Sequence, residues 1–470
     1  MGFQVRRICD KELFTGKNTN ENVYTLLIGN NGCGKSHLLV DISNYYRKLY
    51  SDVVCSQDID LHTTYKQYLE GYQSWDCIIR VLGSSIPKKL ICASTSQFEK
   101  FCPEWRLKKD LKVGGFYSYI GSKPYIPDHQ PSTRIASSAI NQLLKSDIYD
   151  KRKLTSLRRF LKEFGFTTKL ALSIESTISF EELNNYKRDI ALQPETQVIL
   201  KRALEFFEPL EITELLLELE LCIDNPEYVL NISESGITLN VAEFKTSKFS
   251  TNAPCIDQST FSLFLQAGFI TVKDIQTLHT PSPERVGSVF DLKVTPLEKR
   301  SSGEQCLFLL FLGLISSIED NSLILIDEPE ISLHPSWQQR FVSILHDAFD
   351  QYNGCHFIIA THSPLILSDL GGLNSYILDM TSNELISGKE HQARSSDYQL
   401  ANVFHNPGQN NEYLISQAIE VIDSICEGAE LSEENNLKAE KLFEIQKLLK
   451  RDDKAHVLIR ILKETIGRVQ

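Results

Sequence analysis

The stretch Gly29–Ser36, GNNGCGKS, constrains the fold of this 470-residue chain more than any other part of it. It matches the pattern G-x-x-x-x-G-K-S/T at every fixed position. The glycines let the backbone curl so that its N–H groups face a phosphate, and the N-terminus of the following helix adds positive potential. The apolar run Val23–Ile28 predicts a strand before the loop, and a helix is expected from about Lys35. This order of elements predicts a nucleotide-binding domain of the α/β class.

Each polar residue type in the loop suits a particular contact with a nucleotide. Lys35 is expected to reach the β- and γ-phosphates, and the Ser36 hydroxyl is expected to ligate Mg²⁺. We therefore predict ATP and Mg²⁺ as cofactors. The residues expected to hold them here are Gly29, Asn30, Asn31, Gly32, Cys33, Gly34, Lys35 and Ser36. The alternative is a chance glycine-rich turn, but the strand before the loop and the helix after it favour the nucleotide site.

Two carboxylates end a hydrophobic run far downstream, in SLILIDEPE. Asp327 is expected to hold Mg²⁺ through water, and Glu328 to act as general base on the attacking water. A second apolar run, HFIIA, ends shortly before His362, which could there sense the γ-phosphate. The catalytic candidates are therefore Glu328 and His362, and the metal ligands are Ser36 and Asp327. An ordinary charged strand end and a structural histidine are the alternatives.

The sequence RSSGEQ precedes an apolar helix and predicts a second anion site. Because the chain already has a phosphate loop, this site is expected to serve the nucleotide of another copy. That arrangement is a two-fold homodimer with two composite sites. The residues concerned are Ser301, Ser302, Gly303 and Glu304. A plain helix N-cap is the alternative.

The rest of the chain is predicted to form four parts. They are an N-terminal part of the nucleotide-binding domain with the phosphate loop (1–130), a mainly helical insertion (131–290), the C-terminal part of the same domain (291–385), and a helical tail (386–470). The tail is expected to dock a partner or a further copy, although its helices could simply pack on their own domain. Gln97 could couple Mg²⁺ or the attacking water to the insertion, and an ordinary polar loop residue is its alternative.

Several elements inside these parts can be predicted by their periodicity. The run at 88–93 is expected as a strand beside Val23–Ile28, and GGFYSYIGSK as a hairpin. Another hairpin is predicted at 227–241, and Ser375–Met380 is expected to close the sheet. In the tail, 413–427 and 437–466 each read as a helix.

Composition excludes several function classes. A net charge of −12 argues against a protein that coats nucleic acid with its whole surface, so DNA or RNA would need a local basic patch. The candidate patch is KRKLTSLRRFLKEF, 151–164, and an ordinary solvated helix face is its alternative. Eleven cysteines without paired or zinc-type spacing predict reduced thiols and a cytoplasmic location. The most apolar run is too short to span a bilayer, so no membrane contact is expected.

As a set, these motifs resemble the ABC-type ATPase head. GNNGCGKS resembles Walker A, RSSGEQ the signature motif, LILIDEPE Walker B, 332–335 the D-loop, and ATHSP the His switch. The form of the last three is typical of the soluble RecF, SMC and OLD group of AAA ATPases. The resemblance implies that Ser332 also contacts nucleotide. Arg300 replaces the usual leucine of the signature, and little effect is expected.

A narrower resemblance is to the ATPase of the Septu anti-phage system, with a related ATPase beside certain retrons. It rests on NVYTLLIGNNGCGKS, KKLICASTSQFEKF, FYSYIG and SDYQLANVFHNPGQNNEYL. It implies an ATPase subunit that controls a partner HNH endonuclease, in an assembly larger than a dimer. The chain itself is not expected to be a nuclease, because no Asp-x-Asp follows His362. A RecF-like DNA-binding repair ATPase is the alternative, and tight ATP binding with slow turnover stays open.

Overall fold

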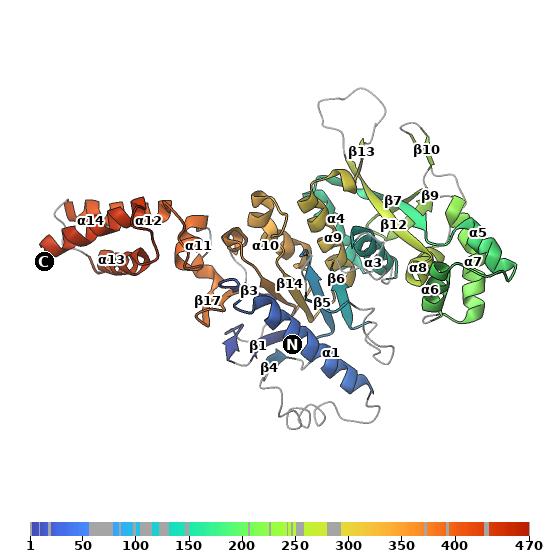
Figure 1. The fold of residues 1–470 in the computed structure, drawn as a ribbon, viewed down its shortest axis with the longest axis horizontal. Helices are drawn as coiled ribbons and strands as arrows, with labels where there is room; N and C mark the ends of the chain where they lie inside the picture. The colour runs from blue at the N-terminus through green and yellow to red at the C-terminus, as the bar shows by residue number, and fades with distance from the viewer. Residues whose placement is uncertain are drawn as a thin grey trace.

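The computed structural model of the chain describes residues 2–8, 10–16, 20–55, 79–83, 86–96, 100–103, 115–121, 131–145, 150–204, 207–224, 227–241, 243–245, 248–250, 258–279, 293–370, 374–391, 394–426 and 432–469. The fold is mixed α/β with a mainly parallel sheet, as the phosphate loop predicts (Figure 1). Gln97 lies outside the described residues.

Within the described residues, a seven-stranded sheet forms the centre of the molecule. Its order is β17-β16-β3-β15-β14-β5-β6, and every neighbouring pair is parallel except β16 and β17. The strands are β3 (Val23–Ile28), β5 (Lys89–Ser94), β6 (Tyr117–Ile120), β14 (Ser322–Asp327), β15 (His356–Ala360), β16 (Ser375–Asp379) and β17 (Glu384–Ser387). Parallel central strands are covered on both faces, which explains why β3, β14 and β15 read as unbroken apolar runs.

The two faces of this sheet belong to two different cores. Leu27 faces a core shared with α1 (Lys35–Cys55) and β1 (Phe3–Ile8), whereas Leu26 and Ile28 face the larger core. β1 pairs with β2 (Lys11–Glu12) and β4 (Ile79–Gly83) in a small antiparallel sheet. The helices over the other face include α9 (Ser302–Ser317) and α10 (Pro335–Phe349). The phosphate loop therefore lies at the carboxyl end of a strand held from both sides.

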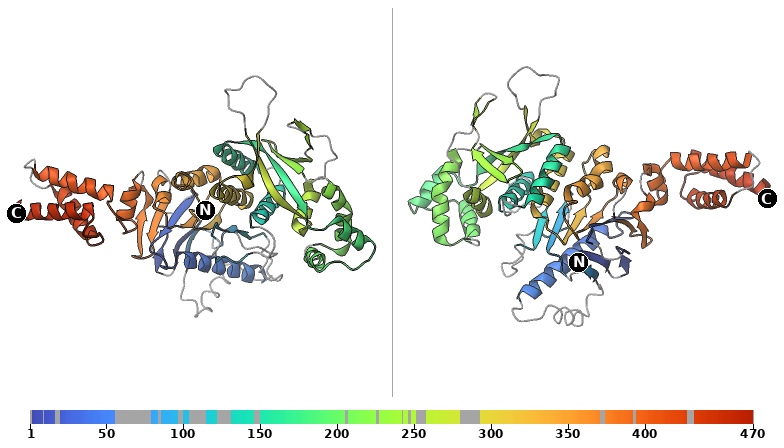
Figure 2. Two further views of the ribbon diagram at one scale, coloured as in Figure 1. Left: turned by 45° about the horizontal axis from the view of Figure 1, so that its top comes forward. Right: turned by 180° about the vertical axis from the view of Figure 1, so that it is seen from behind.

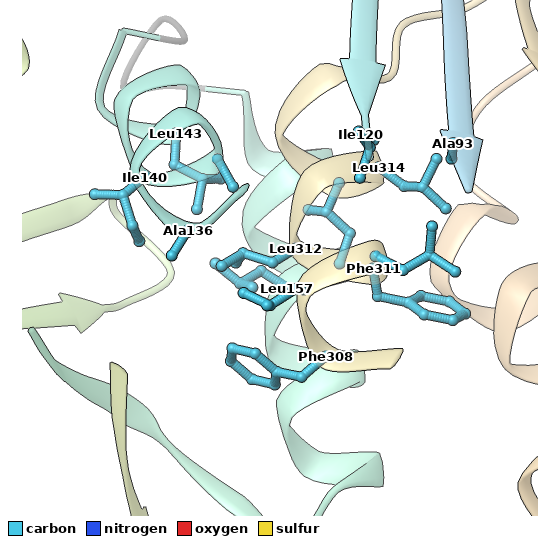
Figure 3. Close-up of a cluster of buried hydrophobic side chains, with 14 of the residues drawn as sticks. Ala93, Ile120, Ala136, Ile140, Leu143, Leu157, Phe308, Phe311, Leu312 and Leu314 are labelled. Atoms are coloured by element: carbon cyan, nitrogen blue, oxygen red, sulfur yellow. The ribbon is translucent and has the colours of Figure 1, made fainter. Parts of the chain in front are cut away.

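Helix α9 is buried almost all round, which its unbroken apolar sequence demands. In Figure 3 it lies between β5 and β6 on one side and α3 (Pro131–Lys145) and α4 (Lys151–Glu163) on the other. A Cβ on Gly313 would stand 2.9 Å from the Ile120 side chain, so the glycine permits close packing of the helix on the sheet edge. The helix that begins at the signature motif thus connects the main sheet to the insertion.

The insertion, together with β13 and η2 just after its predicted end at residue 290, has a five-stranded antiparallel sheet in the order β13-β12-β7-β8-β9, as well as helices (Figure 2). The strands of this sheet are β7 (Phe166–Ser176), β8 (Glu227–Ile232), β9 (Ile237–Val241), β12 (Ile270–His279) and β13 (Lys293–Pro296). The remaining elements are α5 (Phe180–Lys187), α6 (Pro194–Ala203), α7 (Pro209–Asp224), α8 (Gln258–Ala267), the short pair β10 (Glu243–Lys245) and β11 (Lys248–Ser250), and η2 (Leu297–Lys299). Most of its buried hydrophobic residues belong to the same large core as the main sheet, so it packs on the domain that carries the phosphate loop.

The C-terminal helices form a smaller core of their own and extend away from the sheet at the end opposite to the insertion (Figures 1 and 2). They are α12 (Glu412–Cys426), α13 (Glu433–Gln446) and α14 (Lys454–Val469). They are joined to the domain through α11 (Ser396–Asn402), which packs on η3 (Pro364–Asp369). The short helix η4 (Gly388–His391) precedes this connection.

Three expectations about individual elements were wrong. β5 does not lie beside β3, because β15 and β14, which come later in the chain, pair between them. The described part of GGFYSYIGSK is the parallel edge strand β6 rather than a hairpin. The stretch 437–466 is not one helix, because residues 447–453 separate α13 from α14.

Two further details of the fold go beyond the expectations. The hairpin at 227–241 is present as β8 and β9, but a mainly helical description of the insertion omits β7 and β12. β17 rather than β16 ends the main sheet.

Within the described residues, no helix has both the length and the apolar character needed to cross a membrane.

Candidate nucleotide site

The phosphate loop connects β3 to α1 and is shaped by three glycines in the left-handed region. Their φ angles are 132° at Gly29, 82° at Gly32 and 97° at Gly34. Residues with a side chain rarely adopt such angles, so the loop geometry requires glycine at these positions. The loop ends directly at the first turn of α1, where free N–H groups and the helix dipole favour a bound anion.

Lys35 lies under the loop and is buried. Its Nζ donates to the carbonyl oxygen of Gly29 at 2.7 Å and to that of Asn30 at 3.3 Å. It also lies 3.3 Å from Nδ1 of His362. Burial lowers the pKa of the Lys35 ammonium, and nearby carboxylates oppose that change. The structure therefore aims a partly desolvated cation at the place where the loop would hold phosphate.

Ser36 and Asp327 meet although 291 positions separate them in the sequence. The Ser36 hydroxyl donates to Asp327 Oδ1 at 2.9 Å, because β14 and β3 both flank β15. Asp327 is 4% exposed, and this burial raises the pKa of its carboxyl to about 6. A hydroxyl and a carboxylate are hard oxygen ligands of the kind that Mg²⁺ prefers, so the pair fits the predicted metal.

Glu328 follows Asp327 with a left-handed backbone, φ 51°. Such a conformation in a residue with a side chain is uncommon and is often found at functional sites. Two hydrogen bonds hold the Glu328 backbone in place. Its N–H donates to the Ala360 carbonyl at 2.9 Å, and its carbonyl accepts from Thr95 Oγ1 at 2.9 Å. The backbone contacts fix the direction in which the Glu328 carboxylate leaves the strand.

His362 lies between the lysine and the glutamate. Its Nδ1 is 3.3 Å from Lys35 Nζ, and its Nε2 is 3.8 Å from Glu328 Oε1. Because an ammonium can only donate, Nδ1 is the acceptor, and the Nε2 proton faces Glu328. Burial and the charge of Lys35 lower the pKa of His362, so the ring is neutral near pH 7. The structure brings together Lys35, Ser36, Asp327, Glu328 and His362.

The signature residues stand apart from this group. In the described part of the chain, no hydrogen bond joins 301–304 to the phosphate loop, and Ser301 and Ser302 are exposed. Ser301 caps α9 in a capping box with Glu304, which is the plain N-cap arrangement. Gly303 packs against the D-loop so closely that a Cβ there would lie 2.2 Å from the carbonyl oxygen of Ser332. Ser332 is itself left-handed, φ 65°.

Arg300 has a contact that the signature pattern does not predict. Its guanidinium carbon lies 4.7 Å from the centre of the Phe166 ring at the start of β7, and Nη1 lies 3.7 Å from Glu304. The residue therefore connects the start of α9 to the sheet of the insertion.

Sequence reasoning missed several residues around the site. Glu330, in the same DEPE motif, accepts a 2.5 Å hydrogen bond from the backbone N–H of His362. Ser94 donates to the Asp327 carbonyl at 3.2 Å, and Thr95 to that of Glu328. Thr381 accepts from the N–H of Asn30 at 3.2 Å. Glu330 and Thr95 lie close to recognised motifs and could have been found there, whereas Thr381 carries no sequence signal.

The proposed basic patch on α4 is largely occupied by contacts within the chain. Arg152 pairs with Asp320 at 2.8 Å, and Arg159 with Asp350 at 2.6 Å. Lys153 donates to the Ser316 carbonyl at 2.9 Å, and Arg158 pairs with Glu234. Four basic side chains of α4 are therefore engaged within the chain, and a nucleic-acid surface here stays a prediction.

Comparison with known proteins agrees with the geometry. Residues 284–368 match the family described as "AAA domain, putative AbiEii toxin, Type IV TA system". The chain is 39% identical over 74 residues to Protein ea59 of Escherichia phage lambda, a segment that covers 16% of this chain and 14% of that protein.

Two proteins that are named retron probable ATPases are also similar. The Retron Ec83 probable ATPase of Escherichia coli is 30% identical over 98 residues, which cover 21% of this chain and 17% of that protein. The Retron Vc95 probable ATPase of Vibrio cholerae serotype O1 biovar El Tor is 39% identical over 62 residues, which cover 13% and 12%. Each match spans less than a fifth of the relative. With the fold and the site, these similarities support an AAA or ABC-like ATPase domain in this chain.

Proposed function

We propose that the chain binds ATP with Mg²⁺ at the phosphate loop and hydrolyses it. The observation that carries this proposal is the convergence of Lys35, Ser36, Asp327, Glu328 and His362 from three adjacent strands and α1. The similarity to proteins named probable ATPases supports the same reaction.

Each residue of the site has its own proposed role in ATP binding or hydrolysis. Lys35 and the loop N–H groups would hold the β- and γ-phosphates, and Ser36 and Asp327 would hold the metal. When bound, Mg²⁺ would neutralise charge on the phosphate oxygens. Glu328 accepts the proton of the attacking water, and neutral His362 donates from Nε2 toward the same region. Glu330 keeps the backbone of His362 in place.

The test compares three variants with the wild-type protein. Glu328→Gln keeps the size of the side chain but removes the base, so ATP should bind with near wild-type affinity while hydrolysis falls by at least about a hundredfold. Lys35→Ala should lose ATP binding. Glu433→Gln, an exposed position on α13, is the matched control and should behave as wild type. Normal hydrolysis by Glu328→Gln would show that another group is the base.

The complete site is proposed to form between two copies. The N-terminus of α9 is exposed at Ser301 and Ser302 and is packed on the D-loop, while the phosphate loop already has its Walker B partner from its own chain. In the Glu328→Gln variant, which should retain ATP, the mass measured by light scattering should double when Mg²⁺ and ATP are added. A mass that stays the same with bound ATP would contradict the composite site.

At the level of the whole system, we propose an ATPase subunit of an anti-phage defence complex whose nucleotide state controls a partner HNH nuclease. The resemblance to the Septu ATPase and the similarity to retron ATPases support this role. The helices α12–α14, with a core separate from that of the ATPase domain, are the proposed docking element for the nuclease or for further copies.

A pull-down of the full chain from its native host tests this role. Stoichiometric recovery of an HNH nuclease, lost on deletion of 413–470 while ATP binding is kept, is the expected result. Recovery of recombination proteins instead would favour a RecF-like DNA-binding ATPase. That function further requires an affinity for DNA or RNA that falls steeply with salt.

A further inference from the structure

The turn between β16 and β17 lies against the first residues of the phosphate loop. Oγ1 of Thr381 accepts a 3.2 Å hydrogen bond from the backbone N–H of Asn30. Gly29 permits this approach, because a Cβ there would lie 2.9 Å from Thr381 Oγ1 and 3.2 Å from Asp379 Oδ1. The turn and the loop are therefore packed together in a way that a larger residue at position 29 would prevent.

The hydrogen bond from Asn30 involves the same peptide unit whose carbonyl accepts from Lys35. The N–H of Asn30 and the C=O of Gly29 belong to one planar trans peptide, and they point in opposite directions. The C=O end accepts from Lys35 Nζ at 2.7 Å. Rotation of this peptide would break both contacts together, so the hydroxyl of Thr381 fixes the orientation of the carbonyl that holds the ammonium.

Thr381 is itself held by a buried carboxylate. Asp379, 3% exposed, accepts from the Thr381 N–H at 2.8 Å through Oδ1 and from the Ser382 hydroxyl at 2.9 Å through Oδ2. The second oxygen also lies 3.8 Å from Nε2 of His405, which follows α11. The turn therefore has a defined conformation before any nucleotide binds.

We propose that Thr381 is a positioning residue for Lys35 and that Asp379 holds Thr381 in the conformation this requires. The inference rests on the proposed ATP binding, and it adds to that site a residue more than 340 positions away from the phosphate loop. Because Lys35 is expected to contact phosphate both before and during the reaction, loss of Thr381 should weaken ATP binding without slowing the chemical step.

The test uses two substitutions of similar size. Thr381→Val keeps the shape but removes the acceptor, and Thr381→Ser keeps the acceptor. Loss of one such hydrogen bond should weaken ATP binding about fivefold, with KM raised by the same factor and kcat unchanged. Thr381→Ser should restore binding to within about twofold of wild type. Thr465→Val, at a partly exposed threonine on α14 far from the phosphate loop in the sequence, is the control.

Three results would overturn the inference. They are a Thr381→Val affinity equal to that of wild type, equal losses in Thr381→Val and Thr381→Ser, and a fall in kcat at unchanged KM. Because Thr381 is exposed, its substitution should leave the thermal midpoint of the nucleotide-free protein unchanged, which separates positioning from folding. Failure of the wild-type protein to bind ATP would refute the proposed function itself and, with it, this inference.

Discussion

Asp327→Asn should stabilise the protein at neutral pH when no metal is bound. The carboxyl is 4% exposed, and burial raises its pKa from 3.8 to about 6. Asparagine keeps an oxygen that can accept from Ser36 and removes the charge that the folded protein must desolvate. The substitution thus tests whether the carboxylate proposed to hold Mg²⁺ lowers the stability of the protein when no metal is bound.

The magnitude follows from the change in pKa. A difference of about 2 units corresponds to about 3 kcal/mol of folding free energy. Because the folded state has the higher pKa, it binds more protons than the unfolded state between pH 3.8 and 6. Stability from this group is therefore present below pH 4 and is lost as pH rises through 6. The advantage of Asp327→Asn should be largest above pH 7 and should vanish near pH 4.

Thermal unfolding in the presence of a chelator and without nucleotide measures the effect. At pH 7.5 the variant should unfold roughly 3 °C above wild type, and at pH 4.5 this difference should shrink to about a third of that value. Asp452→Asn, an exposed position after α13, controls for a general effect of removing negative charge. The reasoning from burial would be refuted if Asp327→Asn did not raise the unfolding midpoint at pH 7.5, or raised it equally at both pH values.

Other predictions concern close packing and a buried histidine. Gly303→Ala should lower the free energy of unfolding by about 1–3 kcal/mol and reduce ATP turnover, because its Cβ would meet the Ser332 carbonyl at 2.2 Å. Gly467→Ala is the control, because this helical position has open space around it, and the substitution should leave stability unchanged or raise it. Equal denaturation midpoints for Gly303→Ala and Gly467→Ala would contradict the predicted clash at Gly303. His356 is fully buried, its Nδ1 accepts from the Val5 N–H, and burial lowers its pKa to about 3. The stability that neutral His356 contributes should therefore be lost as pH falls from about 6.5 toward 3. Across that range the thermal unfolding midpoint of His356→Gln should depend less on pH than that of wild type.

The core of the site could be predicted from the sequence because each part of it is a local pattern. The loop 29–36, the doublet Asp327–Glu328 and His362 each lie at or just after the end of a strand in a mainly parallel sheet, and the carboxyl ends of such strands meet at one edge. Backbone geometry alone thus brought these residues together in the fold. The role of Ser301–Glu304 stays a prediction, because their proposed partner belongs to another copy.

The sequence by itself determined the order of the motifs, the strands that carry them and the glycines that the loop requires. Tertiary structure alone decided which strands are neighbours, because β14 and β15 pair between β3 and β5 only after residues hundreds of positions apart meet. For the same reason, the pairing of β7 with β12 and the contact of Thr381 with Asn30 could not be predicted from the sequence. The energies of strand pairing and of side-chain contacts depend on groups that are distant in the chain, so the local periodicity of the sequence does not predict them.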